Sequence, residues 1–269
     1  MLSGASVMFV RGVGGTAPLV PSIRTPGAIR AARTPCSTVS LTFDDGPHPT
    51  LTPTALDLLA EFGARATFFV VGTEVDVHPD LVRRAVHDGH EVANHTWSHG
   101  DLVARSDHAI LREVRYTDAA IRRAGVEPVQ QVRPPRGRLD AAAGQVLRSL
   151  GLEIVGWSAS TDPLLADGVD PVDAARRVVA PMRQGSIVLF HDGGPVGGRS
   201  MTALRPLLEE LRAKRLRSVP VGELIDSAQR GVCTAPAHPA HPATPDRLLA
   251  TPPMTQVAAL ERPSDRTGG

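Results

Sequence analysis

The stretch VSLTFDDGP, residues 39–47, decides the fold of this chain. Its first five residues, Val39–Phe43, form a short run with β-branched side chains, which predicts a strand. A Gly-Pro pair ends that strand in a turn, so the carboxylates of Asp44 and Asp45 should project from its tip. Since adjacent residues of an extended chain point to opposite faces, we expect the two carboxylates to diverge. Taken alone, an Asp-Asp-Gly-Pro sequence is more typical of an acidic turn than of a functional site.

Downstream of this strand, strand-like and helix-like segments alternate. Ala66–Val71 is apolar throughout, as a strand covered on both faces would be, whereas Ser106–Ala124 has the length and the N-cap residue of a helix. This alternation predicts a single α/β domain with a parallel sheet. Closure into a (β/α) barrel of about seven strands would explain why polar residues follow the strands, because active sites of such barrels form there. The expected strands are Val39–Phe43, Ala66–Val71, Glu91–Asn94, Gln130–Arg133, Glu153–Trp157, Ser186–Phe190 and Leu216–Pro220, and the expected helices are Pro53–Phe62, Pro79–Asp88, Ser106–Ala124, Asp140–Leu150, Pro171–Met182, Thr202–Ala213 and Gly222–Gln229.

The two ends of the chain differ in composition from the patterned region. Residues 1–36 are rich in Gly, Pro and Arg, and residues 232–269 contain repeated Pro, Ala, Thr and His, so neither end buries enough apolar surface to fold. We therefore expect a flexible N-terminal extension (1–36), one folded domain (37–231) and a disordered Pro-rich tail (232–269). Cys36 and Cys233 flank the domain outside any C-x-x-C spacing. We interpret them as unrelated residues in preference to a disulfide, which would require an oxidising compartment.

The composition of the whole chain restricts the kinds of partner that it can have. The 269 residues carry 29 basic and 28 acidic side chains, a net charge of +1. This balance gives no electrostatic reason to expect nucleic acid or an anionic membrane surface as a partner. No apolar run approaches the roughly 20 residues of a transmembrane segment. The mildly apolar start, Met1–Val10, lacks the preceding basic residues of a signal peptide, so no clear signal peptide is expected. Oligomeric state stays open.

The motif His95-Thr-Trp-Ser-His99 directly follows the expected strand Glu91–Asn94. A spacing of four residues places both imidazoles on one face if the segment turns helically, and two-histidine metal sites use this spacing. Two surface histidines are the alternative interpretation, but the position at a strand end, shared with Asp45, favours a metal site. Two histidines and one carboxylate leave a coordination position open for water, which is typical of a catalytic rather than a structural ion.

Three further polar clusters complete the series. Arg133-Pro-Pro-Arg136-Gly has a rigid, extended backbone, in which Arg133 can hold a carboxylate in a fork and main-chain N–H groups can act as oxyanion donors. His191 follows the very apolar strand Ser186–Phe190 and is well placed as a general acid. Asp162 is the remaining acidic residue of the series. Taken alone, the Arg133–Gly137 segment would be interpreted as a basic surface loop and His191 as a histidine of the core.

Together, these residues make the chain resemble the polysaccharide deacetylase family, the NodB-homology group that is also called carbohydrate esterase family 4. The resemblance covers roughly residues 38–230 and implies a distorted (β/α) barrel with about seven parallel strands. Four family motifs occur in the family order: Thr42-Phe-Asp-Asp-Gly-Pro47, His95-Thr-Trp-Ser-His99, Arg133-Pro-Pro-Arg-Gly137 and Leu189-Phe-His-Asp192.

The resemblance implies a role for each of these residues. It implies that Asp45, His95 and His99 bind a divalent metal, usually Zn²⁺, with Co²⁺ and Ni²⁺ as alternatives. By the same resemblance, Asp44 is the catalytic base, Arg133 orients it and His191 is the general acid. The oxyanion- and substrate-binding residues would be Arg136 through its main-chain N–H, Leu189 beside the acetyl methyl, and Pro135.

The fourth family motif departs from this pattern. The family commonly has Trp-x-x-Asp-x-x-Asp-Trp, whereas this chain reads Trp157-Ser-Ala-Ser-Thr-Asp162-Pro163-Leu164. In the family, the final aspartate supports the acid histidine and the final tryptophan forms a wall of the pocket. We expect Asp162 or Asp167 to replace that carboxylate after a small shift, and no residue to replace the aromatic wall.

The sequence thus predicts a metal-dependent hydrolase that removes N-acetyl groups from GlcNAc-containing poly- or oligosaccharides of the chitin or peptidoglycan type. One alternative is an O-deacetylase of acetylated xylan-type sugars, and another is a catalytically weak glycan-binding module left by the change in the fourth motif. Deformylation or the opening of a small cyclic amide is a third. Carbohydrate is the expected partner, and such substrates imply an extracellular or cell-envelope location.

Overall fold

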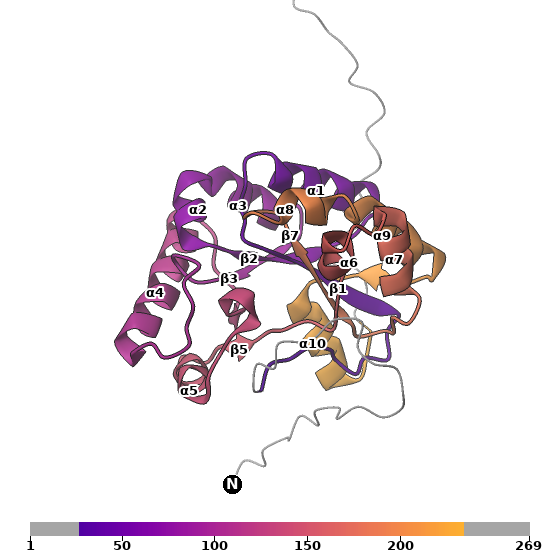
Figure 1. The fold of residues 1–269 in the computed structure, drawn as a ribbon. Helices are drawn as coiled ribbons and strands as arrows, with labels where there is room; N and C mark the ends of the chain where they lie inside the picture. The colour runs from indigo at the N-terminus through magenta and orange to yellow at the C-terminus, as the bar shows by residue number, and fades with distance from the viewer. Residues whose placement is uncertain (1–26, 234–269) are drawn as a thin grey trace, which may run out of the picture.

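The centre of the fold is a curved parallel sheet (Figure 1), seen in a computed structural model that describes residues 27–233. The strand order is β5-β4-β3-β2-β1-β7-β6, all these pairs are parallel, and β8 pairs with the start of β1. The predicted distorted (β/α) barrel is confirmed. The expected disorder of residues 1–26 and 234–269 lies outside the described residues. The strands are β1 (Thr38–Asp44), β2 (Ala66–Val70), β3 (Glu91–Asn94), β4 (Gln131–Val132), β5 (Glu153–Ile154), β6 (Ala159–Ser160), β7 (Ile187–His191) and β8 (Arg217–Ser218).

Helices surround this sheet, and α10 lies on the opposite side of it from α1 and α3 (Figure 1). All seven expected helices are present. Three short helices, α2, α6 and α8, were not expected, because five or six residues are too few to show a helical period. Between residues 27 and 233, no helix has the length and apolar character needed to cross a membrane. The helices are α1 (Leu51–Glu61), α2 (Gly72–Val77), α3 (Pro79–His87), α4 (Asp107–Arg123), α5 (Ala141–Ser149), α6 (Asp162–Ala166), α7 (Pro171–Val179), α8 (Gly197–Met201), α9 (Leu204–Ala213) and α10 (Val221–Arg230), with the 3₁₀ turn η1 at Pro135–Gly137.

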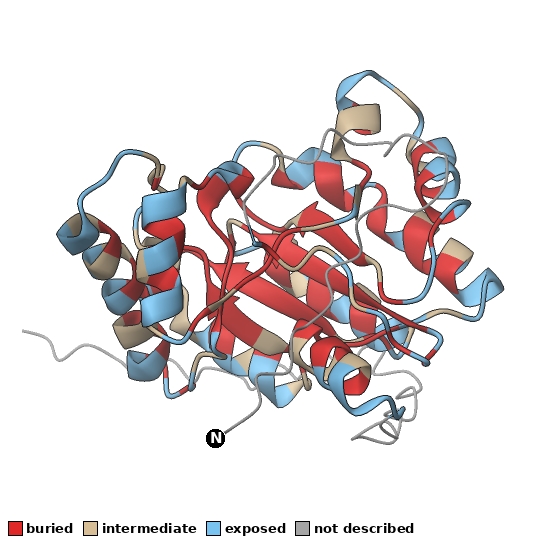
Figure 2. Ribbon diagram, turned by 90° about the horizontal axis from the view of Figure 1, so that it is seen from below, coloured by how far each residue is buried: buried red, intermediate tan, exposed pale blue. Residues whose placement is uncertain are grey.

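The two faces of β1 have different roles. Phe43 stacks on Phe68 of β2 and Phe190 of β7, with ring centroids 4.8 and 5.7 Å apart, and belongs to the large core that α1 and α9 cover. Figure 2 shows the strands as mostly buried, with exposed residues on the outward faces of the helices. Since side chains alternate along a strand, Thr42 and Asp44 lie on the inner face instead. On β1, the outer face therefore packs into the apolar core and the inner face carries polar residues, whereas Phe69, Ala93 and Ile187 of the neighbouring strands form a second apolar cluster with α10.

Residues 28–36, which the sequence analysis placed in the N-terminal extension, make main-chain contacts with the sheet. The Ile29 N–H donates to the Ile154 carbonyl at 2.8 Å, and the Ala32 N–H donates to the Gly185 carbonyl at 2.9 Å. Within residues 27–233, no strand pair joins β5 to β6. The segment thus spans from the end of β5 to the residues before β7.

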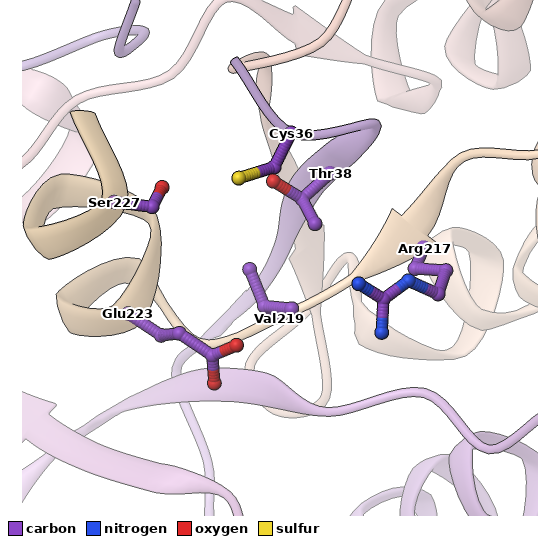
Figure 3. Close-up of a pocket in the computed structure, with 6 residues that line it drawn as sticks. All are labelled: Cys36, Thr38, Arg217, Val219, Glu223 and Ser227. Atoms are coloured by element: carbon purple, nitrogen blue, oxygen red, sulfur yellow. The ribbon is translucent and has the colours of Figure 1, made fainter. Parts of the chain in front are cut away.

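Cys36 and Cys233 form a disulfide, with Cα atoms 5.4 Å apart and a sequence separation of 197 residues. The expectation of two unrelated cysteines is therefore wrong. Cys36 precedes β1 and Cys233 follows α10, and the tertiary packing of α10 brings them together, which no local pattern reveals. The disulfide lies at the start of β1, at the opposite end of that strand from Asp44. A small pocket beside it is lined by Cys36, Thr38, Arg217, Val219, Glu223 and Ser227 (Figure 3).

Candidate active site

The ends of neighbouring strands bring the predicted polar residues together. Asp44 is the last residue of β1 and His191 is the last residue of β7, and the two are Cα partners in the parallel register of these strands. His95 directly follows β3, and its N–H donates to the Val70 carbonyl at the end of β2 at 3.0 Å. Arg133 directly follows β4. The carboxyl ends of parallel strands share one edge of the sheet, so these residues converge as predicted.

Asp44 and Asp45 both face His95, which corrects the expectation that their carboxylates diverge. The Nε2 atom of His95 lies 3.7 Å from Asp44 Oδ2 and 3.4 Å from Asp45 Oδ1. Asp45 has a left-handed backbone, with φ 72°, so the alternation of an extended strand ends before it. Both carboxylates therefore reach the same space.

Asp45, His95 and His99 form a group whose candidate ligand atoms all lie within 4.8 Å of one another. The distance from His99 Nε2 to Asp45 Oδ1 is 3.1 Å. The helical turn that would have placed both imidazoles on one face does not form. Residues 95–99 form a loop in which Thr96 and His99 have positive φ values of 70° and 54°.

The chemistry of these three side chains fits a divalent metal ion. Asp45 Oδ1 is buried and makes no hydrogen bond with the described residues. His95 Nδ1 lies 2.7 Å from the Arg133 carbonyl and must donate its proton there, which leaves the lone pair on Nε2, toward Asp45. Burial lowers the pKa of His99 and outweighs the negative charge of Asp45, which would raise the pKa. The lowered pKa favours the neutral imidazole that metal binding requires. Two imidazole nitrogens and one carboxylate form a typical catalytic zinc ligand set.

The ionised state of Asp45 is favoured by its neighbours. Burial alone would raise its pKa, but the close imidazoles of His95 and His99 outweigh burial and lower the pKa to about 2. Asp45 is therefore a carboxylate at neutral pH, as a metal ligand must be.

Arg133 is fully buried and holds Asp44 in place. Its Nη1 donates to Asp44 Oδ1 at 2.7 Å and to Thr42 Oγ1 at 2.9 Å. The expected two-pronged fork does not form, because Nη2 and Nε donate to the carbonyls of Gly156 and Val155. The guanidinium also lies 4.1 Å from the centroid of the Phe69 ring. These contacts satisfy a buried charge and orient one oxygen of Asp44.

His191 pairs with Asp162, the carboxylate that the sequence analysis selected together with Asp167. Asp162 Oδ2 lies 2.7 Å from His191 Nδ1. Burial alone would lower the pKa of His191, but the hydrogen bond to Asp162 and the charge of Asp44 outweigh burial and raise the pKa. Since Asp162 occupies Nδ1, the other ring nitrogen, Nε2, is the one left for a substrate. Asp167 is the C-cap residue of α6.

Three more predicted residues lie around this group. Pro135 is buried at the start of η1, and the exposed Arg136 has a positive φ of 57°. The charge of Arg136 contributes to the lowered pKa of His99, of which burial is the largest cause. Leu189 is buried and lies two residues before His191, so both side chains lie on the same face of β7.

Asp192 is a buried residue of this region for which the sequence predicted no role, although it ends the motif Leu189-Phe-His-Asp192. The Thr52 hydroxyl donates to Asp192 Oδ2 at 2.5 Å and accepts from the His48 N–H at 2.8 Å. Burial raises the pKa of Asp192 to about 7. A Cβ atom at Gly46 would lie 2.5 Å from Asp192 Oδ2, so the turn after β1 packs directly on this carboxyl.

Comparisons with known proteins agree with this geometry. A family model described as polysaccharide deacetylase matches residues 31–155. A peptidoglycan-N-acetylglucosamine deacetylase of Bacillus cereus is 36% identical over 189 residues, which cover 70% of this chain and 87% of that protein. A chitooligosaccharide deacetylase of Rhizobium leguminosarum bv. trifolii is 46% identical over 174 residues, which cover 62% of this chain and 78% of that protein.

A solved structure of a family 4 carbohydrate esterase from Streptomyces lividans, in complex with acetate, is also similar. It superimposes with a TM-score of 0.63 at 30% sequence identity, covering 77% of this chain and 100% of that chain. The chain belongs to the polysaccharide deacetylase family, as the resemblance predicted.

Proposed function

We propose that this protein is a metal-dependent hydrolase that removes N-acetyl groups from GlcNAc-containing poly- or oligosaccharides and releases acetate. The observation that carries the proposal is the convergence of Asp45, His95 and His99. Beside them lie Asp44, which is hydrogen-bonded to Arg133, and His191, which is hydrogen-bonded to Asp162. The similarity to proteins named peptidoglycan-N-acetylglucosamine and chitooligosaccharide deacetylases supports the substrate class.

Asp45, His95 and His99 would hold the metal, for which Zn²⁺ is the first candidate and Co²⁺ and Ni²⁺ are alternatives. When bound, a divalent ion supplies Lewis acidity toward a carbonyl oxygen and makes water more acidic. The unpartnered Asp45 oxygen and the Nδ1–H bond from His95 to the Arg133 carbonyl support this assignment.

Asp44 acts as the general base. Arg133 occupies Asp44 Oδ1, so Oδ2, which lies 3.7 Å from the ligand nitrogen of His95, is the oxygen available to a water molecule. The water oxygen attacks the acetyl carbonyl carbon as its proton moves to this carboxylate. Burial together with the Arg133 contact fixes the base, so little reorganisation is needed during the reaction.

His191 acts as the general acid. The amide C–N bond breaks with its electron pair on nitrogen, and His191 Nε2 donates a proton to that nitrogen, so that a neutral amine and acetic acid leave, and the acid ionises to acetate in water. An amine anion is a very poor leaving group, so this proton is essential. The Asp162 carboxylate keeps the imidazolium favoured until the proton is transferred.

Pro135, Arg136 and Leu189 would surround the acetyl group. The main-chain N–H of Arg136 is proposed to donate to the developing oxyanion, and Leu189 to contact the acetyl methyl. The left-handed backbone of Arg136 and its place in η1, which follows β4, support this arrangement.

The location is proposed to be extracellular or in the cell envelope, where such polymers occur. The disulfide between Cys36 and Cys233 supports this location, since disulfides persist in oxidising compartments.

An acetate-release screen tests the proposed function. The zinc-loaded protein is incubated with chitooligosaccharides, peptidoglycan and acetylated xylan, and acetate is measured. We expect release from at least one of the two GlcNAc-containing substrates. Release from acetylated xylan alone would show an O-deacetylase, and tight glycan binding without any acetate release would show a binding module.

A further inference from the structure

The loop that carries the two histidines has an unusual backbone. Thr96 and His99 are both left-handed, with φ values of 70° and 54°, and neither is a glycine. L-residues with side chains seldom adopt this conformation, and it persists where surrounding contacts over-determine it. The contacts that hold residues 95–99 therefore bear on the direction of the imidazoles.

Asn94 makes the first of these contacts. Its Oδ1 accepts a hydrogen bond from the Thr96 N–H at 2.8 Å, which closes a local turn around His95. Its Nδ2 donates to the Val114 carbonyl at 2.9 Å and to Asp118 Oδ1 at 2.8 Å. Asn94 is buried, and both acceptors belong to α4. One amide thus joins the turn to that helix.

Glu113 makes the second contact from the same helix. The Ser98 N–H donates to Glu113 Oε2 and the Ser98 hydroxyl donates to Glu113 Oε1, both at 2.9 Å. The carboxylate of Glu113, on α4, thus accepts from both donors of Ser98, which directly precedes His99. Bonds to a charged acceptor are stronger than bonds between neutral groups.

Helix α2 also contacts this loop. The Gly72 N–H donates to the Thr96 carbonyl at 3.0 Å, and the Thr73 N–H donates to the Trp97 carbonyl at 3.1 Å. Helices α2 and α4 lie side by side (Figure 1). The loop and the residue before it are therefore held by two neighbouring helices, by α2 through main-chain groups and by α4 mainly through side chains.

We propose that Asn94 and Glu113 are positioning residues, through which helix α4 fixes the two imidazoles in the geometry that binds the metal. The inference rests on the proposed metal centre. Neither residue is itself a metal ligand. Residues that orient ligands from outside the coordination sphere commonly change metal affinity by ten- to a hundredfold.

Metal affinity of the full chain tests this inference. Zinc dissociation constants are measured by competition with a chromophoric chelator for the wild type, Glu113→Ala, Glu113→Gln and Asn94→Asp. We expect Glu113→Ala to weaken binding about tenfold, within the range typical of such outer contacts, and Glu113→Gln to fall between it and the wild type, because an amide retains one acceptor. Asn94→Asp keeps the acceptor for Thr96 but loses the two donors to α4, so it should weaken binding as well.

A matched control and a spectrum separate positioning from general destabilisation. Glu209→Ala removes an exposed glutamate from α9 and should leave zinc affinity unchanged. The visible absorption spectrum of the Co²⁺-loaded protein should change in Glu113→Ala and not in Glu209→Ala. Wild-type zinc affinity and an unchanged cobalt spectrum in folded Glu113→Ala would overturn the inference while leaving the metal centre intact. A wild-type protein that binds no zinc would overturn both.

Discussion

Asp162 Oδ2 lies 2.7 Å from His191 Nδ1, although the chain has Pro163 at the position where the family commonly places this carboxylate. Asp162 is the first residue of α6, and Pro163 fits the first turn of that helix because a missing N–H costs nothing there. The start of α6 thus brings a carboxylate from one residue earlier in sequence to the same imidazole.

Replacing Asp162 should change the pH dependence of turnover. Asp162 raises the pKa of His191 against the effect of burial, so its removal in Asp162→Asn should lower that pKa. The acid form would then be lost at lower pH, and the alkaline limb of the kcat profile should move toward acid. Turnover measured across pH checks this, with Asp167→Asn as the control. An unmoved alkaline limb would contradict the role of Asp162.

Asp44→Asn should separate chemistry from metal binding. The amide keeps the size of the side chain but cannot take a proton, so kcat should fall by about 10²- to 10⁴-fold, the usual contribution of a general base. Zinc content should stay near that of the wild type, because Asp45, His95 and His99 are unchanged. Near-normal turnover in zinc-loaded Asp44→Asn would show that another group is the base.

His99→Ala and Asp45→Ala should lose metal and activity together. Each removes one of the three proposed ligands, and a site with two ligands should hold zinc weakly. Metal content after dialysis is measured by elemental analysis, together with acetate release. His87→Ala is the control, because this imidazole is exposed on α3. Full zinc occupancy in both ligand variants would exclude this site.

Cys233→Ser should lower stability without altering the chemistry. The bond closes a sequence separation of 197 residues and lies at the end of β1 opposite Asp44. We expect a loss of about 2–4 kcal/mol in the free energy of unfolding, measured by denaturant titration, and unchanged kcat. The double variant Cys36→Ser, Cys233→Ser should match the single one, and a much larger loss in the double variant would show that Cys36 contributes beyond the bond.

The sequence predicted the parallel sheet and the position of the site because both depend on short-range patterns. The expected strands that end at Phe43, Asn94 and Phe190 are visible in the sequence, and the polar residues directly after them predict the edge of the sheet at which the site lies. For the carboxylate beside His191, the sequence left two candidates, Asp162 and Asp167. The position of α6 in the structure decides between them, because it determines which carboxylate reaches the imidazole.

Other features depend on contacts that no local pattern records. The two histidines come together through a left-handed loop held by α4 and not through a helical turn, and the backbone of Asp45 overrides the alternation of its strand. The disulfide was missed because the approach of Cys36 to Cys233 is set by the packing of α10 on β1. Tertiary structure decides each of these cases.

The pairing of Asp44 with His191 across β1 and β7 has a consequence for the evolution of specificity. Strands in one sheet lie about 4.8 Å apart, so main-chain hydrogen bonding sets the spacing of these two residues, and no loop can lengthen it. Sequence changes that adapt the protein to another substrate would then fall in segments that carry neither Asp44 nor His191, such as residues 163–170. The catalytic spacing would then be inherited unchanged while the outer rim diversifies.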